Sequence, residues 1–322
     1  MKIGELEFPL GLSLAPMAGF SDRAMRLLCK KYGAEYSVSE MVSAAAVTFG
    51  DKKTALLSKI EEDEGAVGLQ LFGSRPDIMG EAARIVSEAE YGTRPAFIDI
   101  NMGCPVNKIF SNGEGSALMK SPSQIEKIVR KVKDSTPLPV TVKIRTGIDE
   151  NSINAVDCAL AAEAGGALAL CIHGRTRKQM YLGSVDRKTI AKVKKHLHIP
   201  VIANGDINSG EDARSMLSDT GADGIAVGRG AVGNPFIFSE IKAYLLGGEY
   251  TPPTLKERID AALFQLKTAI ENKGERVAVC EARKQIALYL KGFRGASAVR
   301  GEINRALSFS EVEKILTSLL DG

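Results

Sequence analysis

The sequence contains no tryptophan, only three histidines, and five cysteines among its 322 residues. Five cysteines are too few for a disulfide scaffold, and an odd number leaves at least one thiol unpaired within a monomer, which favours a reducing compartment. No apolar run approaches the roughly 18 residues that a membrane-spanning helix needs, and the first residues do not resemble a secretory signal. We therefore expect a cytoplasmic protein with no membrane partner.

Extremes of charge are also missing, because 42 basic residues stand against 39 acidic ones. A net charge of +3 neither requires nor excludes a polyanionic partner. Hydrophobic residues make up 44% of the chain, which excludes wholesale disorder. With so few histidines and no C-x-x-C pair, the sequence predicts no metal site.

Short apolar segments recur at regular intervals up to about residue 245, and most are the continuous runs typical of parallel strands covered on both faces. They are Leu12–Ala15, Tyr36–Ser39, Val67–Phe72, Phe97–Asn101, Val140–Ile144, Leu168–Ile172, Val201–Ala203 and Ile225–Val227. Helical patterns lie between most of them, with Ser21 and Ser123 as expected N-caps and Glu126 completing a capping box. Eight strands alternating with helices predict an α/β fold, a TIM (β/α)8 barrel.

The pattern changes after a linker that contains Gly247-Gly248 and Pro252-Pro253. Only helical periodicity follows, so we expect a barrel domain over residues 1–248 and an all-helical domain over residues 249–322. Between residues 276 and 305, seven basic residues are opposed only by Glu281 and Glu302. They are Arg276, Arg283, Lys284, Lys291, Arg294, Arg300 and Arg305. This surface either binds a polyanion or is a solvated helix face.

Polar residues and glycines follow nearly every predicted strand, at the rim where barrel enzymes build their active sites. The turns Asn204-Gly205-Asp206 and Gly228-Arg229-Gly230 follow the last two strands, where barrels commonly hold a phosphate. The second turn matches G-x-G-x-x-G, but Pro235 follows it and no further strand does, which argues against a dinucleotide fold. Together with Gln70 and Lys143, the turns predict bound FMN.

Cys104 lies at the same rim, in a Gly-Cys-Pro turn. An unperturbed thiol is mostly protonated at neutral pH and can act as a proton donor. The alternative is a buried, inert cysteine, which is the interpretation we give to Cys29, Cys158, Cys171 and Cys280.

These residues resemble a known family, the tRNA-dihydrouridine synthases, and most closely its B-type bacterial subgroup. The matching segments span the barrel and reach into the helical region. They are Ala15–Asp22, Gln70–Ser74, Asp99–Pro105, Gly115-Ser116, Val142–Gly147, His173–Arg177, Asn204–Asp206, Gly228-Arg229, Arg283-Lys284 and Tyr289–Gly292. The resemblance implies an enzyme that reduces the C5–C6 bond of uridines in tRNA, with FMN as cofactor and NADPH as transient electron donor.

The resemblance also assigns roles to residues. Cys104 would donate the proton to C5, while the flavin N5 delivers hydride to C6. The cofactor would be held by Pro16, Met17, Ala18, Gln70, Lys143, His173, Asn204, Gly205, Asp206, Gly228 and Arg229. The tRNA would be contacted by Asn101, Arg145, Arg175, Arg177, Arg283, Lys284 and Arg294. No protein partner is implied.

Two positions depart from the family pattern, which has His and Trp where this chain has Gln285 and Leu288. The departures bear on tRNA contacts and target position, which the sequence leaves open, and not on the flavin chemistry. Two other functions also stay open at this point. One is an FMN barrel that reduces a small molecule, which would not need the basic helical region. The other is a non-catalytic tRNA-binding barrel, which would not need Cys104 and Lys143.

Overall fold

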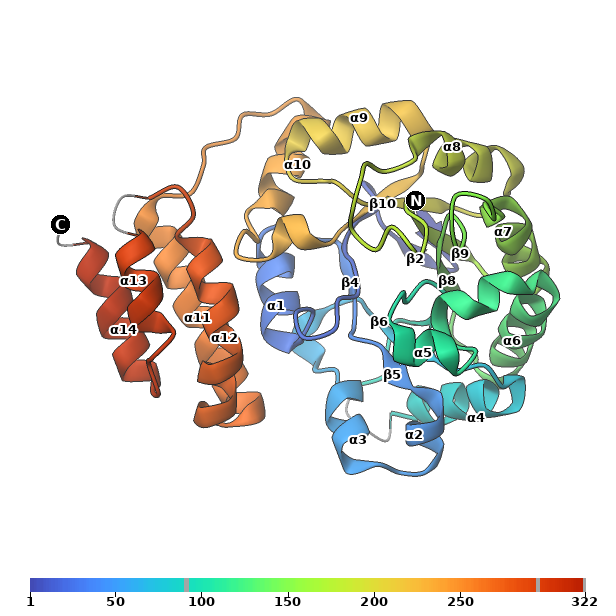
Figure 1. The fold of residues 1–322 in the computed structure, drawn as a ribbon, viewed down its shortest axis with the longest axis horizontal. Coiled ribbons are helices and arrows are strands. Elements are labelled where there is room, and N and C mark those ends of the chain that lie inside the picture. The colour runs from blue at the N-terminus through green and yellow to red at the C-terminus, as the bar shows by residue number, and fades with distance from the viewer. Residues whose placement is uncertain (90–92, 294–295, 321–322) are drawn as a thin grey trace.

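The computed structural model describes residues 1–89, 93–293 and 296–320 and contains a closed barrel of eight parallel strands (Figure 1). The strands are β3 (Leu12–Leu14), β4 (Tyr36–Val38), β6 (Val67–Phe72), β7 (Phe97–Asn101), β8 (Val140–Arg145), β9 (Ala169–His173), β10 (Val201–Asn204) and β11 (Gly224–Val227). Each pairs with the next, and β11 pairs with β3 to close the ring. The predicted TIM barrel and all eight of its strands are confirmed.

Helices cover the outside of this barrel because each carries an apolar face toward the strands. They are α1 (Arg23–Lys31), α4 (Pro76–Ser87), α6 (Pro122–Ser135), α7 (Ala155–Ala164), α8 (Arg187–His196), α9 (Gly210–Thr220) and α10 (Ile237–Leu246). Short helices interrupt the connections at α2 (Ala44–Thr48), α3 (Lys52–Ser58) and α5 (Asn107–Ser111). No helix in the described ranges combines the length and apolar character needed to cross a bilayer.

A hairpin of β1 (Lys2–Ile3) and β2 (Leu6–Glu7) precedes the barrel. Ile3 and the nearby Phe8 are buried with Tyr36 and Phe97 in one apolar cluster. The rings of Phe8 and Tyr36 lie 4.5 Å apart. Because Tyr36 and Phe97 begin their strands, this cluster fills the amino-terminal end of the barrel, and the carboxyl-terminal end is left for the site.

Four helices follow the barrel and lie to one side of it (Figure 1). They are α11 (Leu255–Lys273), α12 (Glu275–Tyr289), α13 (Ala296–Ile303) and α14 (Phe309–Thr317). Helix α10 ends at Gly247 in the left-handed conformation, and α11 begins with a Thr254–Glu257 capping box. The intervening segment is therefore the predicted linker.

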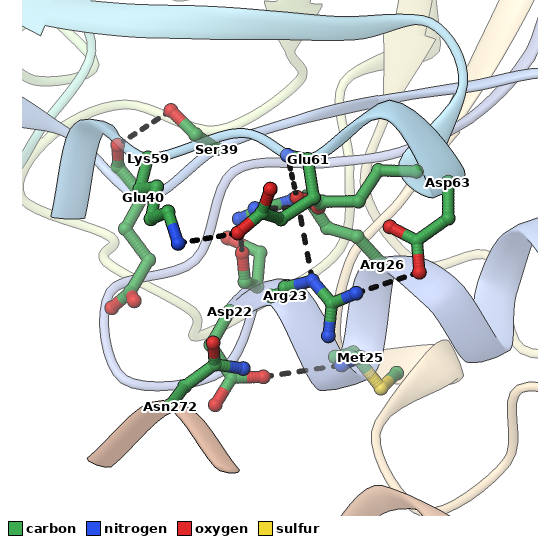
Figure 2. Close-up of polar contacts among 12 residues, drawn as sticks. Asp22, Arg23, Met25, Arg26, Ser39, Glu40, Lys59, Glu61, Asp63 and Asn272 are labelled. Atoms are coloured by element: carbon green, nitrogen blue, oxygen red, sulfur yellow. Dashed lines mark hydrogen bonds and ion pairs between the residues drawn. The ribbon is translucent and has the colours of Figure 1, made fainter. Parts of the chain in front are cut away.

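The helical region and the barrel share apolar and polar contacts. The core of the four helices also includes Ala24 and Leu28 of α1. Gln285 of α12 donates from Nε2 to the carbonyl of Gly19 at 3.2 Å, and Lys273 of α11 contacts Asp22 at 2.7 Å. Figure 2 draws residues from both regions, including Asp22 before α1 and Asn272 of α11.

The predicted helix caps were wrong at two positions. Asp22, not Ser21, caps α1 by accepting from the Met25 amide, as Figure 2 also shows. The Ser21 hydroxyl is instead bonded to the backbone of Met17. Helix α6 begins at Pro122, one residue before Ser123, and has no side-chain cap, so the expected capping box of Ser123 and Glu126 does not form. Proline is well suited to the first helical position.

Candidate active site

A cleft of about 620 Å³ opens at the carboxyl-terminal ends of the strands. It is lined by all of the residues predicted to hold the cofactor, by Cys104, and by Asn101 and Arg145. The residues of the cofactor set are Pro16, Met17, Ala18, Gln70, Lys143, His173, Asn204, Gly205, Asp206, Gly228 and Arg229. Segments that are far apart in the sequence thus meet in one concave site, as barrel topology requires.

Hydrogen bonds from two different segments hold the backbone of Cys104 in the turn after β7. Asn101 Oδ1 accepts hydrogen bonds from the amides of Cys104 at 2.9 Å and Gly103 at 3.2 Å. On the other side, the Ser116 hydroxyl donates to the Cys104 carbonyl at 2.8 Å. Gly115 makes this approach possible, because its φ is +59° and a Cβ there would lie 2.9 Å from Cys104 Cβ. The thiol is therefore held in place by backbone contacts.

Burial raises the pKa of the Cys104 thiol, although the Val106 amide and the Arg145 charge act in the opposite direction. The thiol is therefore protonated at neutral pH. This protonation distinguishes Cys104 from a nucleophilic cysteine, whose pKa is lowered so that the thiolate is available. A buried thiol at the wall of a cleft can instead release a proton to a strong base formed beside it.

His173 also lines the cleft, and imidazoles commonly transfer protons, but the surroundings of this one prevent it. Burial and the positive charges of Lys143, Arg145, Arg175 and Arg229 lower the pKa of His173 to about 2. The imidazole is therefore neutral throughout the physiological range. It can donate or accept a hydrogen bond, but it cannot serve as an imidazolium acid.

Lys143 projects from β8 into the cleft, where its ammonium group donates to Asn204 Oδ1 at 3.1 Å. Asn204 in turn donates from Nδ2 to the Ala226 carbonyl at 2.7 Å. The orientation of the Asn204 amide is therefore set by neighbours on both sides. A fixed positive charge at this depth can stabilise negative charge that develops on a bound group.

The turn after β10 has an unusual backbone. Gly205 has φ of +118°, and Asp206 has φ of +52°, a conformation that costs a side-chain-bearing residue energy. Contacts from Arg175 Nη2 at 2.7 Å and the Val185 amide at 3.2 Å hold the Asp206 carboxylate. Across the cleft wall, Arg229 lies 3.7 Å from Asp206. These contacts shape a concave turn with a guanidinium group at its edge.

The arginines predicted to contact tRNA differ in exposure. Arg145 is 3% exposed and Arg175 is 2% exposed. Arg145 donates to the carbonyls of Gly103, Thr176 and Met180, each at 2.9 Å. These two arginines therefore brace the loops of the site, and Arg145 also lines the cleft. Their contact with tRNA stays a prediction.

Arg177, in the loop after β9, donates to Asn107 Oδ1 at 2.6 Å and lies over the ring of Phe110 at 3.7 Å. On the helical region, Arg283 is bonded to the Ala306 carbonyl, whereas Lys284 is exposed. Arg294 lies outside the described residues. Among the arginines and lysines of the predicted set that the structure describes, Lys284 is exposed, whereas Arg177 and Arg283 are half-buried.

Sequence reasoning missed several residues that line the cleft, notably Met41, Tyr181 and Leu288. The ring of Tyr181 lies 4.6 Å from the Arg229 guanidinium carbon, in the loop after β9. An aromatic residue so close to the polar segment after that strand was a signal that could have been used. Position 288 was singled out for tRNA contacts but not for the cleft, which Leu288 of α12 reaches only through the packing of the two regions.

Similar proteins are known from several bacteria. The chain is 39% identical to a probable tRNA-dihydrouridine synthase of Rickettsia conorii, covering 94% of this chain and 91% of the relative. It is 41% identical to tRNA-dihydrouridine synthase B of Vibrio vulnificus, covering 94% of each. It is 40% identical to probable tRNA-dihydrouridine synthase 1 of Synechocystis, covering 98% of this chain and 88% of the relative.

Solved structures support the fold independently. A variant of the NCR protein from Zymomonas mobilis, whose parent is described as an old yellow enzyme homologue, superimposes with a TM-score of 0.53 at 15% identity. The match covers 80% of this chain and 93% of that one, which shows a shared barrel. The family model described as dihydrouridine synthase matches residues 13–321. The chain therefore belongs to the dihydrouridine synthase family.

Proposed function

We propose that this chain, as a tRNA-dihydrouridine synthase, is an oxidoreductase that reduces the C5–C6 bond of uridines in tRNA, using FMN as cofactor and NADPH as reductant. The observation that carries this proposal is the placement of Cys104. Its protonated thiol shares one cleft with Lys143, Gln70 and the two glycine turns, so a proton donor stands beside a site suited to a flavin.

The residues present fit FMN. The turns at Gly205 and Gly228 offer backbone amides, and Arg229 offers a guanidinium group, for a phosphate. The Asp206 carboxylate is occupied by Arg175, so only its backbone fits an anion. Gln70 and Lys143 supply polar contacts for a heterocyclic ring. Bound FMN would take up hydride from NADPH and deliver it to C6 of the uracil.

The protein's part in the chemistry is to supply the proton and to position the groups. Cys104 donates its proton to C5, since His173 is neutral and cannot replace it as the acid. Arg145 holds the Gly103 carbonyl and so keeps the Cys104 turn against the cleft.

The cleft lies at the bottom of the barrel mouth, so a uridine must leave its stack in folded tRNA to reach it. The exposed basic residues of the helical region provide the phosphate contacts that such a large substrate needs. They include Arg276, Lys284, Lys291, Arg300 and Arg305. A reductase that acts on small molecules does not need a basic surface of this kind.

The test is reconstitution of the purified protein with FMN, followed by NADPH and unmodified tRNA. Nucleoside mass spectrometry should then detect dihydrouridine, and the Cys104→Ala variant should form far less of it. If the protein holds flavin and consumes NADPH with a small activated alkene but leaves tRNA unchanged, the small-molecule reductase is the correct assignment. If it holds no flavin, the cofactor assignment is wrong.

A further inference from the structure

A buried carboxylate lies below the cleft and has no part in the mechanism above. Asp99, on β7, is 3% exposed and lies between β6 and β8. It accepts hydrogen bonds from Gln70 Nε2 and from the Thr141 hydroxyl, each at 2.6 Å. Burial raises the pKa of Asp99, while both hydrogen bonds and Lys143 favour its ionised form.

Asp99 begins a continuous chain of hydrogen bonds that ends at the catalytic turn. Gln70 donates to Asp99 and accepts from Asn101 Nδ2 at 2.8 Å through its own Oε1. Asn101 Oδ1 then accepts from the Cys104 amide at 2.9 Å. Four residues from two adjacent strands and the following turn are thus linked in one direction.

At the two ends of this chain of hydrogen bonds, the roles of donor and acceptor are fixed. At the two side-chain amides between them, these roles are not fixed. Both carboxylate oxygens of Asp99 accept hydrogen bonds here, and a backbone amide only donates, whereas the side-chain amides of Gln70 and Asn101 can each point either way. Only one arrangement satisfies both ends: each amide turns its nitrogen toward Asp99 and its oxygen toward Cys104. Without Asp99, the chain loses the end that defines this orientation.

We propose that Asp99 is a positioning residue that orients the Gln70 and Asn101 amides and thereby holds the Cys104 turn in place. Thr141 binds the other carboxylate oxygen and is not part of the chain. The consequence for catalysis rests on the proposed function, but the positioning itself does not. It can be measured by the reactivity of the Cys104 thiol in the resting protein.

The experiment measures the rate at which iodoacetamide alkylates Cys104, with peptide mass spectrometry to separate it from the other four thiols. Asp99→Leu removes the acceptor at the end of the hydrogen-bond chain. The rate of alkylation at Cys104 should then rise about tenfold, the factor expected when the local opening of a structure no longer has to break one buried hydrogen bond. Thr141→Val is the matched control, because it removes a hydrogen bond from the same carboxylate but leaves the chain intact. Its rate should stay within about twofold of the parent.

Asp99→Asn provides the rescue. Its carbonyl can still accept from Gln70 while its nitrogen donates to the Thr141 hydroxyl, so the direction of the chain survives and the Cys104 rate should match that of Thr141→Val. Gln70→Leu breaks the hydrogen-bond chain at its next member and should raise the alkylation rate as Asp99→Leu does. It serves as the test if Asp99→Leu fails to fold.

An unchanged alkylation rate in a folded Asp99→Leu or Gln70→Leu protein overturns the proposal. So does an equal rise in Thr141→Val, because that would report general loosening. None of these alkylation rates depends on dihydrouridine formation. They can therefore be interpreted even if the proposed function is wrong.

Discussion

At the scale of single residues, burial acts in opposite directions on the two groups that could move a proton. It keeps the proton on the Cys104 thiol by raising its pKa, and it removes the proton from His173 by lowering its pKa to about 2. In both cases the neutral form is favoured, as expected when charge is desolvated. The neutral thiol still has a proton to give, whereas the neutral imidazole is a far weaker acid. Desolvation therefore favours Cys104 over His173 as the proton donor.

The first prediction separates the two half-reactions. In Cys104→Ala, reduction of the flavin by NADPH should be unchanged, because hydride arrival needs no thiol. Reduction of uridine should fall by about 10²–10⁴, the usual contribution of a general acid. Single-turnover measurements of each step decide this, with Cys280→Ala as a control. The expectation that Cys280 is buried was wrong, and its thiol is exposed on the helical region. Equal loss in both steps would mean that Cys104 supports the fold or the cofactor instead.

The pH dependence of the uridine step follows from the same two groups. A proton donor works below its pKa, so the rate should be lost as pH rises through the pKa of Cys104. Because that pKa is raised, the loss should occur above the ordinary value for cysteine, 9.0. His173 should add no transition near its ordinary value of 6.5. Single turnovers of the pre-reduced enzyme across pH test this, and a transition centred near 6.5 would assign the donor to the imidazole.

At the scale of elements, the short segment after α5 controls how closely Cys104 can be approached. Gly113 and Gly115 both have positive φ, at +77° and +59°. A Cβ on Gly115 would strike Cys104, whereas one on Gly113 would meet nothing within 4 Å. The two glycines therefore impose the same backbone requirement but differ in their contact with the site.

This difference yields a matched pair of variants. Gly113→Ala should lower the free energy of unfolding by about 1–2 kcal/mol, because it places a side chain in a left-handed conformation. Gly115→Ala should lower it further, because its Cβ would also meet Cys104 and Ile109. Only Gly115→Ala should also slow uridine reduction, since it displaces the Cys104 turn. Denaturant unfolding and single-turnover rates measure the two effects. If Gly113→Ala slows the reaction equally, the contact with Cys104 is not the cause.

The sequence predicted the barrel well because its strands are buried on both faces and therefore appear as continuous apolar runs. The cofactor set also gathered as expected, since barrel topology brings strand ends to one rim. Local interactions were harder to predict. Ser21 and Asp22 are both good caps, and only the structure shows that Met17 engages the serine. The burial of Arg145 depends on carbonyls in two loops, which no local pattern encodes.

At the scale of the whole molecule, the basic helical surface should bind tRNA independently of the cofactor. Changing Lys284, Lys291 and Arg300 to alanine should weaken tRNA binding and reduce the salt slope by roughly 0.7–0.9 per lost phosphate contact. All three side chains are exposed, so the fold should persist, whereas Arg283 is bonded to the Ala306 carbonyl and is left intact. Affinity at several salt concentrations, with flavin content as control, tests this. An unchanged slope would mean that these residues face solvent only.

Helix α12 meets the barrel where Leu288 packs on Gly233, whose φ is +69°. A side chain at Gly233 would come within 2.8 Å of the Leu288 backbone, so this approach depends on glycine. Leu288 also lines the cleft. The helical region that we propose binds tRNA thus also contributes part of the cleft wall. A chimera that received its last helices from a relative would therefore change the lining of the cleft together with the proposed RNA-binding surface.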